Sequence, residues 1–277
     1  MKIDTLILSS GGSKGIGYIG FFYAIQKTNI FNMKNIKNIF GCSVGSIFGF
    51  LLLLDFNITM IYKLLQKIDL INLKKFNIDE MFLDNGIFNN NSIKRFLKTC
   101  LKYKYNITDI TFIELYKKTN IKFRIQVYNL SLQKNENFSY KNKPNLSVID
   151  VIQISSCIHI IFKPIKYNNY YYIDGGINNS TPFFNKKKYK NYLILYLTNI
   201  NHDLNNNNSI NYENINFIKY INNIFNINMS NYKKKNKRYI RLVVNLDISD
   251  FNIKNVLDYN IINCYNQTID HIKKYKL

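Results

Sequence analysis

Three short segments of the chain combine serine, aspartate and glycine residues in patterns that suit acyl-transfer chemistry. They are residues 10–15 (SGGSKG), residues 41–45 (GCSVG) and residues 174–176 (DGG). A serine hydroxyl becomes a nucleophile when a neighbouring group accepts its proton, and the oxyanion that then forms needs N–H donors. In chain order, the three segments therefore predict oxyanion donors, a nucleophile and a base.

The G-x-S-x-G segment follows a short apolar strand and precedes an apolar helix. A strand-to-helix turn that exposes a serine hydroxyl crowds its neighbours, which explains the glycines at positions Gly41 and Gly45. The helix that begins there directs backbone N–H groups and its positive end towards the reacting atoms. Ser43 is therefore the candidate nucleophile, and the alternative is a tight turn without catalytic function. Cys42 is expected to be a packed core thiol.

The glycine-rich loop comes directly after the first predicted strand, where a helix start supplies N–H groups that a substrate can approach. The loop lacks the Gly-Lys-Ser/Thr ending of a Walker A phosphate loop. Residues 15–20 match G-x-G-x-x-G, but they begin well past the strand, and the second strand ends in Phe40-Gly41 where a dinucleotide fold has an acidic residue. A nucleotide site is therefore disfavoured, and Gly17 and Gly20 are expected to permit close helix packing.

Asp174 follows the apolar strand 170–173, and two glycines leave space beside its carboxylate. In that position it can act as a general base towards a serine on a neighbouring strand, although the pattern also fits a simple Asp-Gly turn. A Ser-His-Asp triad is disfavoured. His271 lies on a lysine-rich terminal helix, and His202 lies in an asparagine-rich loop.

Strands and helices alternate in the first 55 residues, which predicts a parallel α/β sheet. The expected order there is strand 4–9, helix 15–29, strand 36–41 and helix 43–55. Beyond this point the expected helices are 59–69, 92–103, 111–119 and 147–157, the last capped by Ser147, with a terminal helix after residue 251. The expected later strands are 122–132, 136–140, 170–173, 192–198 and 239–246, with a turn at 84–86 and a polar loop at 201–214.

Composition excludes several classes of protein. With 47% apolar residues in 277, the chain is not fully disordered, and no apolar run reaches the length of a membrane span. No secretory signal is expected at the N-terminus, so we expect a cytoplasmic protein. The four cysteines are widely spaced without a Cys-x-x-Cys, and the three histidines are dispersed. A disulfide framework and a metal site are therefore not expected.

The formal net charge of +21 points to nucleic acid or to an anionic membrane. Much of this excess is explained by AT-rich codons, because Lys, Asn, Ile, Tyr and Phe are all abundant. A nucleic-acid-binding protein is the less favoured interpretation, because the chain has only four Arg and shows no nucleic-acid motif.

The order of the three segments resembles that of the patatin-like phospholipases, serine acyl hydrolases that use a Ser–Asp dyad. Their glycine-rich loop (G-G-G-x-[R/K]-G), G-x-S-x-G elbow and D-G-[G/A] segment are matched here at Gly11, Gly12, Lys14, Gly15, Gly41, Ser43, Gly45, Asp174, Gly175 and Gly176. Residues 155–164 and 178–182 are similar to the family's segments before and after D-G-G. The sequence departs from the pattern at Ser10, which replaces the first glycine, at Ser13 in the variable position, and at His159.

The resemblance covers residues 4–200 and implies a three-layer α/β/α domain with a mainly parallel central sheet. Residues 201–277 would complete this domain or pack on it. The implied site has a Ser43–Asp174 dyad, oxyanion donors at Gly11, Gly12 and Ser13, and loop-orienting roles for Lys14 and Gly15. His159 would shape the pocket, with a modest acid–base role as the alternative. No cofactor is implied.

The resemblance also implies the partner: fatty-acyl esters of phospholipids or lysophospholipids, hydrolysed through an acyl-enzyme. The basic runs 186–190 and 233–241 would then favour transient contact with an anionic membrane surface. The alternative is a catalytically weak or inactive protein that keeps the fold and binds lipid.

Overall fold

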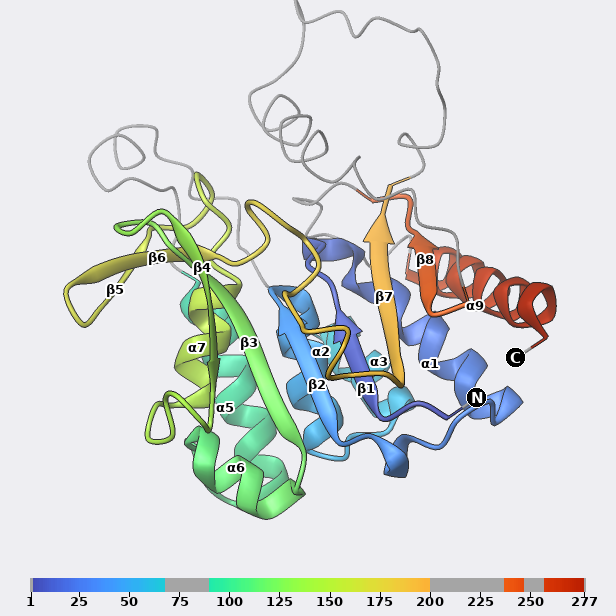
Figure 1. Ribbon diagram of the computed structural model, residues 1–277, viewed down its shortest axis with the longest axis horizontal. Coiled ribbons are helices and arrows are strands. Elements are labelled where there is room, and N and C mark those ends of the chain that lie inside the picture. The colour runs from blue at the N-terminus through green and yellow to red at the C-terminus, as the bar shows by residue number, and fades with distance from the viewer. Residues whose placement is uncertain (1, 68–89, 200–236, 247–256, 277) are drawn as a thin grey trace, which may run out of the picture.

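A central sheet organises the molecule, as a computed structural model of the chain shows (Figure 1). The structure describes residues 2–67, 90–199, 237–246 and 257–276. In that part of the chain the sheet has eight strands in the order β5-β6-β3-β2-β1-β7-β8, and β4 pairs with β3. The strands are β1 (Thr5–Leu8), β2 (Asn38–Cys42), β3 (Lys122–Asn129), β4 (Lys134–Ser139), β5 (Ile165–Tyr167), β6 (Tyr170–Asp174), β7 (Tyr192–Thr198) and β8 (Tyr239–Val243).

The sheet is mostly parallel, which confirms the mixed α/β class predicted from the sequence. Parallel pairing joins β3, β2, β1, β7 and β8, whereas β3–β4, β3–β6 and β5–β6 are antiparallel. The short strand β5 was not predicted. It is joined to β6 by Asn168 and Asn169, which both have positive φ (45° and 65°), as a two-residue hairpin turn of type I′ requires.

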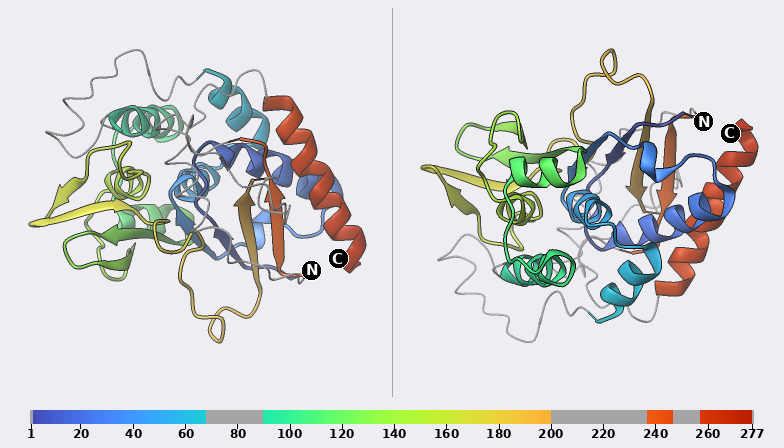
Figure 2. Two further views of the ribbon diagram at one scale, coloured as in Figure 1. Left: turned by 90° about the horizontal axis from the view of Figure 1, so that it is seen from above. Right: turned by 90° about the horizontal axis from the view of Figure 1, so that it is seen from below.

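The α-helices begin close to the positions that the sequence predicts. They are α1 (Gly17–Thr28), α2 (Val44–Leu53), α3 (Ile58–Lys67), α5 (Asn91–Tyr105), α6 (Phe112–Thr119), α7 (Val148–Ser155) and α9 (Leu257–Tyr275). Two short 3-10 helices, η1 (Gly12–Ile16) and η2 (Met33–Asn35), were not predicted. The predicted Ser147 cap of α7 is confirmed, because its hydroxyl accepts the Asp150 N–H at 3.2 Å. Gly17 and Gly20 lie where α1 meets α9, and a Cβ at Gly20 would lie 2.3 Å from the Ile261 carbonyl oxygen. The two helices run side by side (Figures 1 and 2).

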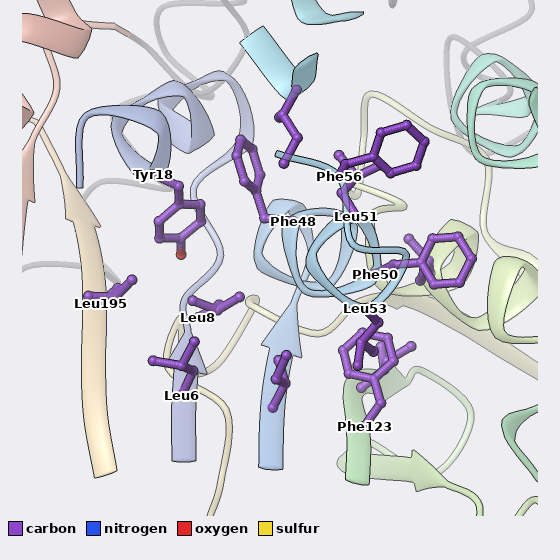
Figure 3. Packing of buried hydrophobic residues seen from close by; sticks show 14 of the residues in the cluster. Leu6, Leu8, Tyr18, Phe48, Phe50, Leu51, Leu53, Phe56, Phe123 and Leu195 are labelled. Atoms are coloured by element: carbon purple, nitrogen blue, oxygen red, sulfur yellow. The ribbon is translucent and has the colours of Figure 1, made fainter. Parts of the chain in front are cut away.

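Alternate residues along the strands point to opposite faces of the sheet and form two separate hydrophobic cores. The larger core lies between the sheet and the helices, where Leu6, Leu8 and Leu195 meet Tyr18 and Phe48 (Figure 3). The smaller core, on the opposite face, contains Ile7, Phe40, Ile194, Tyr196 and Tyr239 and packs against Phe184, Tyr189 and Tyr192. Within the described residues the layer over this second face is therefore the segment 176–191, which contains no helix.

Three sequence expectations fall on residues that the structure does not describe: the turn at 84–86, the polar loop at 201–214, and the first part of the basic run 233–241. Among the described residues, no helix combines the length and the apolar character needed to cross a bilayer.

Candidate active site

Ser43 occupies a strained backbone position between β2 and α2. Its φ of 52° and ψ of −127° lie in a region that L residues rarely adopt. β2 ends at Cys42 and α2 starts at Val44, so the direction of the chain changes at this single residue. Such strain persists only where the surrounding structure enforces it, and it is concentrated at functional sites. The strand-turn-helix context that the sequence predicts for Ser43 is confirmed.

The two glycines of the elbow are explained by close backbone contacts. A Cβ at Gly41 would lie 2.6 Å from the Ser46 Cα, and a Cβ at Gly45 would lie 2.3 Å from the Leu8 carbonyl oxygen. Any larger residue at either position would push α2 away from the ends of β1 and β2. The elbow is therefore held against the sheet by main-chain packing.

Asp174 ends β6, and its carboxylate accepts hydrogen bonds from the Ser43 hydroxyl and, at 2.7 Å, from the Gly176 N–H. The side chain is buried, with the residue 6% exposed. Burial raises the pKa of Asp174 to about 6, and the two hydrogen bonds offset part of that rise because they favour the ionised form. The two residues that the sequence proposes as nucleophile and base are thus brought into direct contact.

A buried glutamine and a serine connect the elbow to the D-G-G segment. The Ser43 N–H donates to the Ser155 Oγ at 2.8 Å, and that hydroxyl donates to the Gln126 carbonyl at 2.6 Å. The fully buried Gln126 amide donates to the carbonyls of Gly175 (2.8 Å) and Asn179 (3.1 Å) and accepts the Phe183 N–H (2.9 Å).

Sequence reasoning assigned no role in the site to Gln126. The signal was a polar residue between two apolar residues, Ile125 and Val127, in a predicted strand, because a buried amide is retained only where its hydrogen bonds are made. Ser155 was noted as part of a small-residue run, without its contact to the elbow.

The glycine-rich loop lies beside the elbow. Gly12 has a φ of 56°, and the Lys14 N–H donates to the Gly11 carbonyl at 3.1 Å, closing the turn that opens η1. A Cβ at Gly15 would lie 2.2 Å from the Val44 Cγ2, so the loop packs on the first residue of α2. Lys14 is fully buried. The loop therefore holds a compact shape next to Ser43.

The departure at Ser10 is accommodated by the fold. Positive φ within the loop falls at Gly12 and not at residue 10. The Ser10 N–H donates to the Ser180 carbonyl at 2.7 Å, which joins the loop to the segment after D-G-G. A Cβ at Gly176 would lie 2.3 Å from the Ser10 Oγ and 3.0 Å from the Asp174 Oδ1, so Ser10 lies next to the carboxylate.

Two of the three histidines, His159 and His271, lie in the part of the chain that the structure describes. Burial lowers the pKa of His159 to about 4, so its imidazole is neutral at neutral pH. His271 contacts the Tyr275 ring on α9 and lies 3.4 Å from the Lys237 carbonyl oxygen. His202 lies outside the described residues.

Cys42 is a fully buried thiol, as predicted, and burial followed by the nearby Asp174 raises its pKa well above the usual range. Over the described ranges, no three His, Cys, Asp or Glu side chains gather as metal ligands would.

The sequence matches a known protein family. The family model for patatin-like phospholipases matches residues 6–185, and the chain belongs to this family. The match includes the glycine-rich loop, the elbow and the D-G-G segment.

Two viral proteins are similar in sequence. The probable lipid hydrolase 463L of Invertebrate iridescent virus 6 is 32% identical over 192 residues, covering 68% of this chain and 64% of that protein. The uncharacterized protein R571 of Acanthamoeba polyphaga mimivirus is 28% identical over 178 residues, covering 63% and 58%. The matched region thus spans less than two thirds of either relative.

Two bacterial structures share the fold. VipD from Legionella pneumophila aligns with a TM-score of 0.66 at 16% identity, covering 99% of this chain and 67% of that one. ExoU from Pseudomonas aeruginosa, in its complex with SpcU, aligns with a TM-score of 0.57 at 15% identity, covering 99% and 52%.

Proposed function

We propose that the protein is a serine-dependent lipid acyl hydrolase that cleaves fatty-acyl esters of phospholipids or lysophospholipids through a Ser43–Asp174 dyad. The contact between the Ser43 hydroxyl and the buried Asp174 carboxylate carries this proposal. With a pKa of about 6, Asp174 is ionised at neutral pH and is still basic enough to accept a proton in the transition state. Family membership and the name of the 463L relative support the substrate class.

In the acylation step, Asp174 accepts the Ser43 proton as the Ser43 Oγ attacks the ester carbonyl carbon. The negative charge that develops on the carbonyl oxygen is stabilised by N–H groups of Gly11, Gly12 and Ser13, and by the positive end of α2. The tetrahedral intermediate collapses by breaking the bond to the leaving alcohol. That alcohol takes the proton from Asp174, and the acyl group remains on Ser43.

In the deacylation step, a water molecule attacks the acyl-enzyme while Asp174 accepts one of its protons. Collapse of the second tetrahedral intermediate releases the fatty acid, and the proton on Asp174 returns to the Ser43 Oγ. One ester and one water are consumed, and one acid and one alcohol are formed. The cycle therefore balances with protein groups and water alone.

The supporting residues have separate tasks in this mechanism. Gln126 and Ser155 position the base and the elbow relative to one another. Lys14, fully buried, orients the glycine-rich loop from within and does not reach a substrate headgroup. Gly15 lets the loop pack against Val44.

The direct test is fatty-acid release from mixed phospholipid vesicles in the presence of a chelator. The unaltered protein is compared with Ser43→Ala and Asp174→Asn. Matched controls are Ser156→Ala, whose hydroxyl makes no hydrogen bond to the described residues, and Asp150→Asn, whose half-exposed carboxylate pairs with Lys94 at 2.6 Å.

Release that both dyad variants abolish and both controls retain is the expected result. Absence of release from the unaltered protein, with vesicle binding retained, would overturn hydrolysis in favour of lipid binding without turnover. Release that survives Asp174→Asn would assign the base to another group, and His159 would be tested next.

A further inference from the structure

We infer that the tips of the β3–β4 and β5–β6 hairpins form an interfacial anchor that inserts into an anionic lipid surface beside the dyad. This inference rests on the proposed function, because it names how the site reaches a substrate held in a bilayer. Four of the eight large apolar side chains that are most exposed among the described residues lie on these two turns: Leu130, Leu132, Tyr170 and Tyr171. Their exposed fractions range from 39% to 47%.

The two tips form one surface. The Leu130 N–H donates to the Tyr171 carbonyl at 2.8 Å, and the Tyr171 N–H donates to the Ser131 Oγ at 2.9 Å. The Leu132 N–H is held by the Asn129 Oδ1 at 3.0 Å. The turns that carry the exposed side chains are therefore already ordered. Binding of these side chains to a surface costs little additional backbone entropy.

The chemistry of the tips matches that of a lipid headgroup region. Residues 128–133 and 167–173 contain no charged side chain, and their aromatic residues are all tyrosines. Tyrosine is enriched at membrane–water interfaces because its ring is apolar and its hydroxyl is polar. Apolar side chains grouped on an exposed surface are typical of an interaction site.

Basic residues flank the patch. Lys134 is exposed and lies 3.8 Å from Glu136, and the Lys166 Nζ lies 6.0 Å from the centre of the Tyr171 ring. Glu136 is the sole acidic residue near the tips in the described part of these hairpins, and its side chain is 23% exposed. The net charge around the tips is therefore positive, which complements anionic lipids.

The tips lie next to the dyad along the chain. Gln126 pairs with Cys42 immediately before Ser43, and β3 continues for three residues to Asn129, about 10 Å further along the strand. Tyr170 is four residues before Asp174 on β6, about 13 Å away. A lipid whose headgroup lies at the tips thus has its ester groups within a lipid's length of Ser43.

The basic run 186–190 is less well placed. It leads to Asn191, directly before β7, and the Asn191 carbonyl accepts the Asp4 N–H at 2.9 Å, at the edge where β1 begins. Ser43 lies at the edge where β2 ends. Lysines in this run can contribute long-range attraction, but they do not border the dyad.

The inference is tested by vesicle sedimentation in a Ser43→Ala background, where binding does not depend on turnover. Vesicles contain phosphatidylcholine with or without phosphatidylserine. Two hairpin variants, Leu130→Ser with Leu132→Ser and Tyr170→Ser with Tyr171→Ser, are compared with Tyr259→Ser plus Ile262→Ser. The last pair removes apolar side chains that are even more exposed from α9, at the other end of the molecule (Figure 1).

Each hairpin variant is expected to lower the vesicle partition coefficient by about tenfold or more. Burial of a single apolar side chain of this size already changes a partition coefficient by about tenfold. The α9 variant is expected to bind as the parent does. Replacing Lys134 and Lys166 with Gln should weaken binding about fivefold each, and only when phosphatidylserine is present. Parental binding by both hairpin variants would overturn the inference, and so would equal loss in the α9 variant.

A second measurement keeps the result clear if a hairpin variant folds poorly. The four native cysteines are buried, so an environment-sensitive fluorophore can be attached selectively to Leu132→Cys or to Ile262→Cys. Vesicles should shift the emission of the probe at 132 to shorter wavelength and leave that at 262 unchanged. An unchanged probe at 132 while the protein sediments with vesicles would place the anchor elsewhere.

Hydrolysis of a water-soluble short-chain ester, measured with Ser43 restored, separates this inference from the proposed function. If the anchor operates, vesicle hydrolysis falls relative to ester hydrolysis in the hairpin variants. A chain that binds vesicles through the tips yet hydrolyses neither substrate would refute the proposed function and leave the anchor standing. If the protein hydrolyses the ester and the hairpin variants bind and hydrolyse vesicles as the parent does, the anchor alone is refuted.

Discussion

The two halves of the sheet hold the proposed dyad by different means. On the parallel side, β1 and β2 fix Ser43 by close main-chain packing, because Gly45 lies directly against the Leu8 carbonyl. On the antiparallel side, Asp174 ends a strand that pairs with β3 over only three residues, Val127 to Asn129. There, side-chain hydrogen bonds from Gln126 hold the D-G-G segment.

This difference shows where the dyad is vulnerable. The nucleophile is positioned by close main-chain contacts at Gly41 and Gly45, which depend on the absence of side chains there. The base is positioned by the buried side-chain amide of Gln126, which is distant in the sequence. This support depends on the presence of a side chain. Gln126 and Ser155 lie where the two halves of the sheet meet. Substitutions there should distinguish the main-chain packing that positions Ser43 from the hydrogen bonds that position Asp174.

The largest expected effect is that of Asp174→Asn, which removes the base and keeps its shape. We expect kcat for a soluble ester to fall by about 10³–10⁴-fold, since an amide accepts no proton but can still accept the Gly176 N–H. In the unaltered protein the rate should fall as pH drops through about 6, where Asp174 becomes protonated. A kcat profile that is flat between pH 5 and 7 would show that the base is a different group.

The same variant should be more stable than the parent at neutral pH. Asp174 titrates near 3.8 when unfolded and near 6 when folded, so between these values the folded state binds more protons. Parental stability therefore falls as pH rises through this window, by about 3 kcal/mol in all. The amide introduced by the substitution does not titrate. Urea unfolding should show the difference at pH 7 and its loss near pH 4, and a pH-independent difference would contradict the raised pKa.

Gln126→Leu should weaken the antiparallel half. It leaves the carbonyls of Gly175 and Asn179 and the N–H of Phe183 without their partner, which we expect to lower the free energy of unfolding by about 3 kcal/mol. Displacement of Asp174 should lower kcat about 10²-fold. Exposed Gln26 on α1 provides the matched change Gln26→Leu, expected to be near neutral. Equal effects of the two substitutions on kcat would show that Gln126 does not position Asp174.

Ser155→Ala tests the junction itself, with a smaller expected effect. The Ser43 N–H loses its acceptor and the Gln126 carbonyl loses a donor, so stability should fall by about 1–3 kcal/mol. We expect kcat to fall about tenfold with KM little changed, because the elbow shifts while the substrate surface remains. Ser156→Ala, one residue away, is the control, and activity loss of the same size there would mean that general packing at the end of α7 is responsible.

The accuracy of the sequence predictions follows the same division between the halves. Ser43, Gly41 and Gly45 could be located because an elbow needs those residue types within five positions, and the flanking strand and helix have clear apolar patterns. Asp174 could be proposed from its motif, but its contact with Ser43 depends on strand order, which no local pattern encodes. β5 was missed because three residues around an Asn-Asn turn give too short a pattern, and Gln126 was missed because its partners lie about 50 residues away.

The smallest expected effect is that of Ser10→Gly, which restores the family's loop pattern. Residue 10 does not need positive φ, and the Ser10 hydroxyl makes no hydrogen bond to the described residues, so kcat should change by less than about threefold. Gly12→Ala is the informative partner, because Gly12 has a φ of 56° and the added Cβ should lower stability by about 1–2 kcal/mol and disturb the proposed oxyanion donors. Ester hydrolysis and thermal unfolding of both variants would check this contrast. If Ser10→Gly instead lowered kcat strongly, the Ser10 hydroxyl beside Asp174 would belong to the catalytic machinery of the loop.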